Sequence, residues 1–220
     1  MKRTWALLIA ATAACAQAQT MNMEEIADAL GVRCNYCHSA PRGSGQPEPK
    51  KDIALAMMAM TRDLNAKVQE ATGKPANEAT RVECVTCHRG VAIPQPLSAI
   101  ILRTIAENGG AAAVEQYRDL RKRFYSRATY DFSEDALLKI VQRVVQGKPD
   151  DAIALLRMNL EFNPQSAKTY ALLGFAYTRK VDDASAITNL EKSLELDPSN
   201  AMVRGQLEQL QEYHRRRQQQ

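Results

Sequence analysis

Four of the five cysteines and two of the three histidines fall into two copies of one short motif, Cys-x-x-Cys-His. The copies are Cys34-Asn-Tyr-Cys37-His38 and Cys84-Val-Thr-Cys87-His88. This spacing is the signature of covalently attached c-type haem. Two thiols three residues apart lie on one face of a helical turn, where each can form a thioether with a vinyl group of one porphyrin. The sequence therefore predicts two covalently bound haem c groups, with His38 and His88 as the proximal iron ligands.

Two other uses of paired cysteines fit this sequence less well. In a zinc ribbon the pairs are usually about 15 to 20 residues apart, whereas residues 38–83 separate the two pairs here. Zinc also does not require a histidine directly after each pair. A thioredoxin-like redox motif belongs to a βαβ setting, whereas helical patterns dominate this chain. Haem attachment is therefore the favoured interpretation.

A short helix is predicted directly before the first motif. Residues 23–30 place Met23, Ile26, Ala27 and Leu30 on one stripe, and Gly31 ends the pattern. A helix followed by a tight turn can fold back along the porphyrin. Met23, fifteen residues before His38, could then bind the opposite face of the iron, with Met21 as the alternative.

A longer helix, from Lys50 to about Glu70, is predicted before the second motif. Met57 and Met60 lie one turn apart on the same face of that helix, and either could be the sixth ligand. A single methionine in a helix ordinarily fills a core. However, His214 is the only histidine outside the motifs, so two irons with two histidines each cannot be built from this chain. Methionine ligation of both irons is therefore expected, and it raises the reduction potential.

The region from about residue 21 to about residue 96 resembles one half of the tetrahaem cytochrome subunit of photosynthetic reaction centres. The resemblance lies in three stretches, residues 23–38, residues 50–65 (KKDIALAMMAMTRDLN) and residues 82–90 (VECVTCHRG) with Pro94. It implies a distal methionine on the helix before each motif, which carries over onto Met23 and Met60, with Met57 in reserve. Free-standing dihaem relatives occur in non-photosynthetic bacteria. The subunit has four haem motifs and this chain has two, so photosynthesis does not follow from the resemblance.

The first residues read as a secretory signal peptide, residues 1–18. They combine a charged start, an apolar run too short to span a bilayer, and the cleavage site Ala16-Gln-Ala18. Cys15 would leave with the signal, unless it is the acylated cysteine of a lipoprotein, which is the one case in which membrane attachment is expected. The mature chain is expected to be periplasmic or extracellular. A net charge of +4 is too small to indicate nucleic-acid binding.

A 34-residue period appears in the second half of the chain. Ala152 to Pro164 aligns with Ala186 to Pro198, a shift of 34 at both ends, which is the period of tetratricopeptide (TPR) repeats. The second repeat has the expected residue types at Tyr170, Leu173, Gly174, Tyr177, Ala186, Leu190 and Pro198.

The expected fold is all-α, a small two-haem c-type cytochrome domain followed by a TPR-type helical solenoid. Its parts are the signal peptide 1–18, the dihaem domain 19–96, a linking helical hairpin 97–132, and TPR repeats with a C-terminal capping helix at 133–220.

Together these features predict an exported dihaem cytochrome c that carries electrons and is not an enzyme. Redox protein partners would dock at the haem edges and on the TPR surface. One alternative is a self-assembling, electron-conducting filament built by a non-closing contact between copies, in which His214 could ligate a neighbour's iron. A less favoured alternative is a dihaem peroxidase-like enzyme, which needs one iron with an open site.

Overall fold

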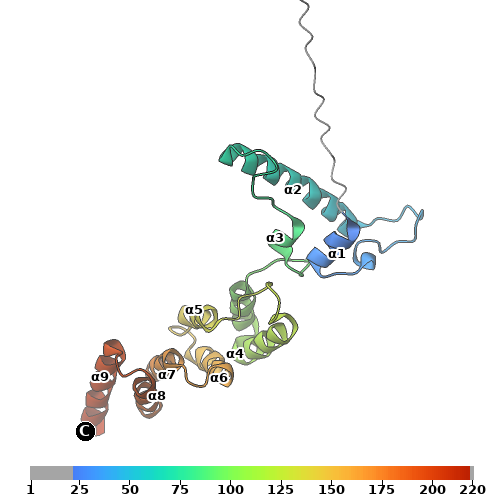
Figure 1. The fold of residues 1–220 in the computed structure, drawn as a ribbon. Helices are drawn as coiled ribbons and strands as arrows, with labels where there is room; N and C mark the ends of the chain where they lie inside the picture. The colour runs from blue at the N-terminus through green and yellow to red at the C-terminus, as the bar shows by residue number, and fades with distance from the viewer. Residues whose placement is uncertain (1–21, 219–220) are drawn as a thin grey trace, which may run out of the picture. The chain divides into compact units, whose positions relative to one another are not determined.

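The computed structural model describes residues 22–218, and within that range the regular secondary structure is helical, without strands (Figure 1). The predicted all-α class is thus confirmed. The signal peptide, Cys15 and Met21 lie outside the described residues. No helix in the described range has the length and apolar character needed to cross a membrane.

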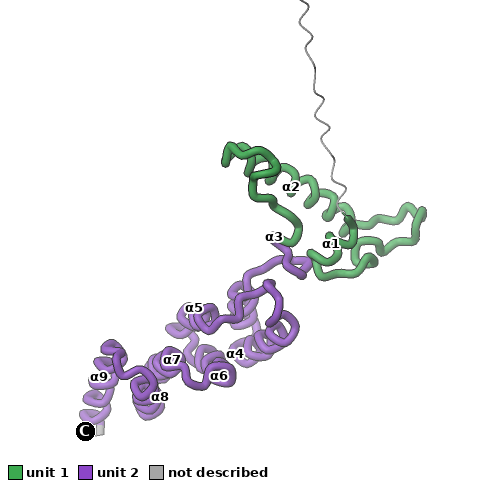
Figure 2. Tube along the Cα trace, in the orientation of Figure 1, with its two compact units in different colours: residues 1–86 green, residues 87–220 purple. Residues whose placement is uncertain are grey.

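The chain divides into two compact units, residues 1–86 and residues 87–220 (Figure 2). The division falls inside the short helix α3 (Cys84–His88), which carries the second haem motif. Each unit is therefore described by itself.

The described part of unit 1, before α3, contains two longer helices and one short helical turn. Helix α1 spans Met23–Leu30, the 3₁₀ turn η1 spans Cys34–Tyr36, and helix α2 spans Pro49–Thr72. The side chain of Asn22 caps α1 by accepting a hydrogen bond from the Glu24 N–H at 3.0 Å. Gly31 ends α1 in the left-handed conformation (φ 64°), as the sequence predicts. Proline at the first position of α2 has no N–H to leave unpaired there.

Unit 1 buries very little of its own surface. Between residues 22 and 86, Ala29 is the only buried residue, and the 24-residue helix α2 has none. Apolar side chains on α2 lie exposed instead, among them Ile53 and Met60. A segment of this size needs a further apolar partner to form a core.

Unit 2 is a succession of packed helices. They are α4 (Leu97–Phe124), α5 (Glu134–Val144), α6 (Pro149–Phe162), α7 (Ala167–Arg179), α8 (Asp183–Leu196) and α9 (Ala201–Gln218). Each helix from α5 to α8 packs against the next one along the chain, and α4 packs against α5 and α6. Helices α6 and α8 begin 34 residues apart, at 149 and 183.

Two glycines allow close helix packing in unit 2. Helix α4 is broken at Gly109, whose φ of 81° is left-handed, and Gly110 donates a hydrogen bond to the Asp151 Oδ1 at 2.7 Å. A Cβ on Gly110 would lie 2.6 Å from the Asp151 Cα, so only glycine fits. A Cβ on Gly174 in α7 would likewise lie 2.6 Å from Cγ of the fully buried Leu190 in α8.

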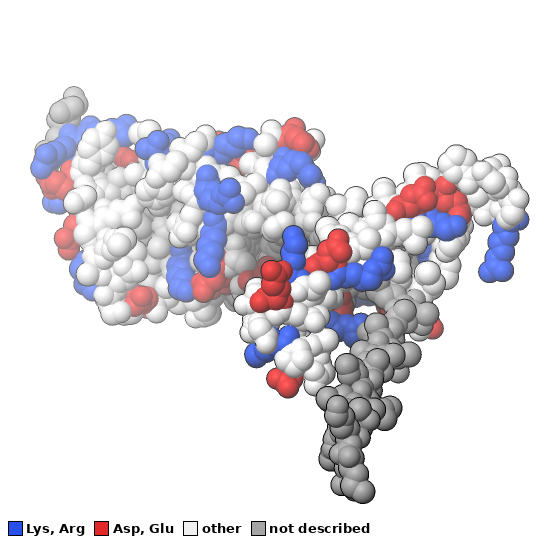
Figure 3. All heavy atoms as spheres, turned by 90° about the horizontal axis from the view of Figure 1, so that it is seen from above, with Lys and Arg blue, Asp and Glu red and all other residues white. Residues whose placement is uncertain are grey.

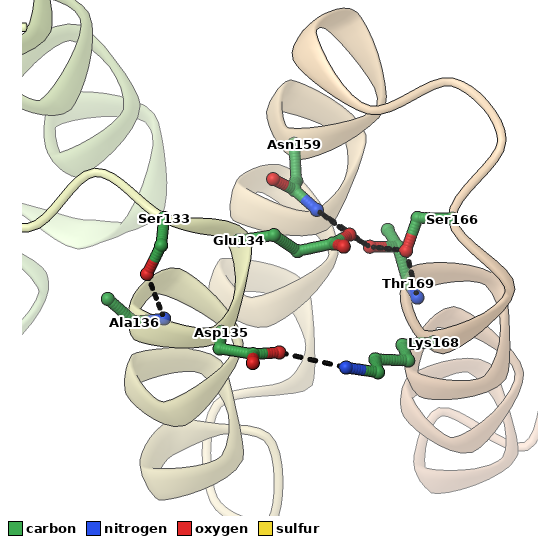
Figure 4. A network of polar contacts seen from close by, with 8 residues as sticks. All are labelled: Ser133, Glu134, Asp135, Ala136, Asn159, Ser166, Lys168 and Thr169. Atoms are coloured by element: carbon green, nitrogen blue, oxygen red, sulfur yellow. Dashed lines mark hydrogen bonds and ion pairs between the residues drawn. The ribbon is translucent and has the colours of Figure 1, made fainter.

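A buried polar network joins α5, α6 and α7 (Figure 4). The Asn159 amide donates hydrogen bonds to Thr169 Oγ1 at 2.7 Å and to Glu134 Oε1 at 3.0 Å, and Thr169 Oγ1 in turn donates to Glu134 Oε1 at 3.1 Å. Ser166 caps α7 and donates to the same hydroxyl at 2.9 Å. Because Asn159 and Thr169 are almost fully buried, these bonds offset the cost of removing their polar groups from water.

Candidate haem-binding sites

The first motif folds into a tight helical turn. Residues Cys34–Tyr36 form the 3₁₀ turn η1, and the N–H of His38 donates to the carbonyl of Cys34 at 3.0 Å. Residues i and i+3 lie one above the other in this geometry, which puts Cys34 and Cys37 on one side of the turn. Cys34 is exposed, Cys37 is half-buried, and the side chain of His38 is 52% exposed.

The second motif folds as the short helix α3, in which Cys84 and Cys87 are one turn apart. Thr86 Oγ1 accepts a hydrogen bond from the Glu83 N–H at 3.0 Å, just before the helix begins. Cys84 is half-buried and Cys87 is exposed. Both copies of the motif therefore adopt a helical turn that places their two cysteines on one side.

The imidazole of His88 is held in one orientation. His88 is buried, and its Nδ1 lies 3.0 Å from the carbonyl oxygen of Val91. A carbonyl can only accept, so Nδ1 carries a proton, and the neutral tautomer with this contact has its lone pair on Nε2. An Nε2 lone pair with Nδ1–H held by a backbone carbonyl is the usual arrangement of a metal-binding histidine.

The imidazole of His38 faces a carboxylate instead. Its Nδ1 lies 3.9 Å from Glu48 Oε1, longer than a hydrogen bond but within electrostatic range. Glu48 also accepts a hydrogen bond from Lys51 Nζ at 3.1 Å and one from the Ala40 N–H at 3.4 Å. The bond from Lys51 is the main reason that the pKa of Glu48 lies below its ordinary 4.5, so this group is a carboxylate at neutral pH.

The methionines predicted as distal ligands are accessible on their helices. Met23 opens α1 and is 60% exposed, whereas Met21 lies outside the described residues. On α2, Met60 is 45% exposed and Met57 is half-buried. Both α2 methionines belong to an apolar stripe at helical spacing, which consists of Ile53, Met57, Met60 and Leu64.

These features fit a haem better than a bare metal ion. Within residues 22–218, no three or more His, Cys, Asp or Glu side chains gather as a metal ion would require. A porphyrin needs paired thiols, one imidazole with a free Nε2 and a large apolar surface. The two motifs offer the thiols, His88 offers the imidazole, and the exposed stripe on α2 offers an apolar face.

Sequence reasoning missed three groups around these sites. Glu48, Val91 and Asn65 contact the motifs or the chain next to them through hydrogen bonds or charge. Nothing in local spacing marks Glu48 or Val91, because their roles depend on how the loops fold. Asn65 lies in a stretch that resembles the reaction-centre cytochromes, but the stretch alone assigns it no partner.

His214 is held inside unit 2. Its Nδ1 lies 3.4 Å from Oδ2 of the buried Asp183, and the same oxygen accepts a hydrogen bond from Arg217 at 3.0 Å. These contacts tie α9 to the start of α8, which is a structural use for the histidine that the filament alternative would assign to a neighbour's iron.

Comparisons with known proteins agree with the haem motifs. Cytochrome c-554 of Chloroflexus aurantiacus is 34% identical over 73 residues, and the photosynthetic reaction center cytochrome c subunit of Rubrivivax gelatinosus is 32% identical over 83 residues; each match covers 33% of this chain. The matches span only 17% and 22% of those proteins' own lengths. Cellulose synthase operon protein C of Escherichia coli is 40% identical over 58 residues, 26% of this chain and 5% of that protein.

A family model adds a longer match than any of these relatives. The model described as the photosynthetic reaction centre cytochrome C subunit matches residues 20–174, well over half of the 220 residues. The match includes both Cys-x-x-Cys-His motifs and the helices that precede them. The chain therefore belongs to the photosynthetic reaction centre cytochrome c subunit family.

Proposed function

We propose that this chain is an exported electron carrier that holds two c-type haems, one at each motif. The observation that carries the proposal is the repeated arrangement of a methionine-bearing helix followed by a helical Cys-x-x-Cys-His turn. Haem, when bound, supplies one-electron chemistry. The residues of this chain attach it, orient it and set its potential.

The proposed proximal ligands are His38 and His88, and the proposed distal ligands are Met23 and Met60, with Met21 and Met57 as alternatives. Support comes from the exposed thioether side chains of Met23 and Met60 and from the apolar stripe that contains Met57. An iron with both axial positions filled by protein has no position for a substrate. Electron transfer is therefore favoured over a peroxidase-like reaction.

We further propose that α5 to α8 are two TPR repeats and that α9 is their capping helix. The 34-residue offset between α6 and α8 and the close approach of α7 and α8 at Gly174 support this assignment. Repeats of this kind commonly bind proteins, so unit 2 would recruit the redox partner while the haems exchange electrons with it.

Spectroscopy combined with redox titration tests the ligand assignment. The oxidised wild-type protein should show the weak methionine-to-iron band at roughly 695 nm and no high-spin signal. Met23→Ala should lower one of the two potentials, and either Met60→Ala or Met57→Ala should lower the other, because methionine ligation raises the potential. If none of the three substitutions changes a potential or the spin state, the ligand assignment is wrong. A high-spin iron in the wild type would favour the peroxidase-like alternative.

A further inference from the structure

One side chain ties helix α2 to the chain that enters the second haem motif. The amide of Asn65 makes two hydrogen bonds to the backbone of Val82, two residues before Cys84. Asn65 Oδ1 accepts from the Val82 N–H at 2.8 Å, and Asn65 Nδ2 donates to the Val82 carbonyl at 2.8 Å. Both residues are half-buried and belong to unit 1. Because two hydrogen bonds join the same groups, they fix both the orientation of the Val82 backbone and its distance from the Asn65 side chain.

The segment held by this contact has no regular secondary structure. Residues 73–83 form turns and irregular chain between α2 and α3, without a helix of their own. Val82 would otherwise have to satisfy its N–H and C=O with water, as loop backbone does. The side chain of Asn65 therefore replaces the backbone pairing that a regular element would provide.

The contact continues along α2 toward the candidate distal ligands. Asn65 Nδ2 also donates to the Thr61 carbonyl at 2.9 Å, and Thr61 Oγ1 donates to the Met57 carbonyl at 2.9 Å. Met57, Thr61 and Asn65 are four residues apart in turn, so they follow one row along the helix. The row connects the turn that carries Met57 and Met60 with Val82, two residues before Cys84.

From this geometry we propose that Asn65 is the positioning residue of the second haem site. It holds Val82, two residues before the second motif, against the helix that carries Met57 and Met60. The inference rests on the proposed function, since it assumes a haem at Cys84 and Cys87 with a methionine from α2. It adds a residue that is neither a proposed iron ligand nor a thioether anchor but positions the chain just before the anchoring cysteines. The first site has no part in this contact and serves as an internal reference.

The test compares four full-length holoproteins: wild type, Asn65→Ala, Asn65→Asp and Thr72→Val. Asn65→Asp keeps the side-chain shape but loses the donor to the Val82 carbonyl. Thr72→Val is the matched control, because it removes a 2.7 Å hydrogen bond to the Val68 carbonyl near the end of the same helix. The readouts are haems per chain by intact mass, the methionine-to-iron band of oxidised protein, and both reduction potentials.

Asn65→Ala should retain the first haem with unchanged potential and alter only the second. The expected result is a drop in one potential with the methionine-to-iron band reduced to about half, since one of two haems loses its thioether ligand. A chain with one haem, attached at the first motif, would equally support the inference. Asn65→Asp should act in the same direction, and Thr72→Val should match the wild type.

Two results would overturn the inference. One is a wild-type spectrum and wild-type potentials in Asn65→Ala. The other is an equal loss or shift of both haems in Asn65→Ala and Asn65→Asp, which would mean that the contact only stabilises unit 1 as a whole. Failure of the proposed function itself looks different, because the wild-type protein would then lack two methionine-ligated haems before any substitution is made.

Discussion

At the scale of single residues, the two histidines proposed as proximal ligands differ in what faces their Nδ1 atoms. His88 is buried and donates to the neutral carbonyl of Val91, whereas His38 is largely exposed and faces the Glu48 carboxylate. A carboxylate beside Nδ1–H makes the imidazole a stronger donor to iron and stabilises the ferric state. Greater exposure also favours the more highly charged ferric form. Both differences should make the His38 haem the lower-potential one of the pair.

The role of Glu48 can be tested by removing its charge. Glu48→Gln should raise the potential of the His38 haem and leave the His88 haem unchanged, with a tenfold change in the ratio of the two states corresponding to about 59 mV. Lys51→Met, which removes the positive charge beside Glu48, should shift the same potential downward. Optical redox titration at neutral pH measures the two haem potentials in each variant. A fall in potential, or none, in Glu48→Gln would contradict the assigned role.

At the scale of helices, Gly174 sets how closely α7 and α8 approach. The added methyl group of Gly174→Ala would overlap Leu190, so about 1 to 3 kcal/mol of unfolding free energy should be lost. Gly205→Ala in α9 is the control, because an added Cβ there would have no atom within 4 Å beyond its neighbours and the local helix backbone, and alanine favours a helix by roughly 0.5 to 1 kcal/mol. Urea unfolding followed by circular dichroism should give Gly174→Ala a lower free energy of unfolding than Gly205→Ala. Equal stability of the two variants would argue against tight packing at Gly174.

The stability of α8 depends on pH through its N-terminal cap. The Asp182 side chain caps α8, and its hydrogen bonds from Ser185 hold the pKa of its carboxyl below the ordinary 3.8. This stabilisation is fully present at pH values above the ordinary pKa of 3.8. It is lost as the pH falls through the lower pKa that the carboxyl has in the folded protein. Asp182→Asn keeps a capping group but does not titrate. Its unfolding free energy should therefore fall less steeply below about pH 4 than that of the wild type, as urea titrations at several pH values would show; identical slopes would contradict this.

The same scale shows what the sequence could and could not predict. The end of α1 at Gly31 and the close approach at Gly174 follow from local rules, because a left-handed cap and a helix crossing both select glycine. The first haem motif forms a 3₁₀ turn, whereas spacing alone indicates only a helical turn. The partners Glu48 and Asn65 could not be predicted, because their contacts join residues that lie 10 and 17 positions apart in the sequence (38 to 48 and 65 to 82). Such contacts leave no periodic signal in a single sequence.

At the scale of the whole molecule, the two units differ in how they are stabilised. The buried apolar residues lie almost entirely in unit 2, beginning at Leu97, whereas the described part of unit 1 contributes Ala29 alone. Charged side chains of both signs are interspersed among the described residues drawn in Figure 3. The family match nevertheless continues from the haem motifs into unit 2, as far as residue 174.

This uneven core predicts that covalent haem attachment orders unit 1 and leaves unit 2 largely unaffected. The full-length chain carrying Cys34→Ala, Cys37→Ala, Cys84→Ala and Cys87→Ala cannot form the thioethers, so the apolar stripe on α2 loses the surface that would cover it. Hydrogen exchange read by mass spectrometry should show rapid exchange over residues 22–86 and slow, cooperative exchange over residues 97–218, because exchange protection follows local burial. In the wild-type holoprotein both regions should be protected. Strong protection of α2 in the variant would mean that unit 1 folds without haem and that its exposed stripe is covered by something else.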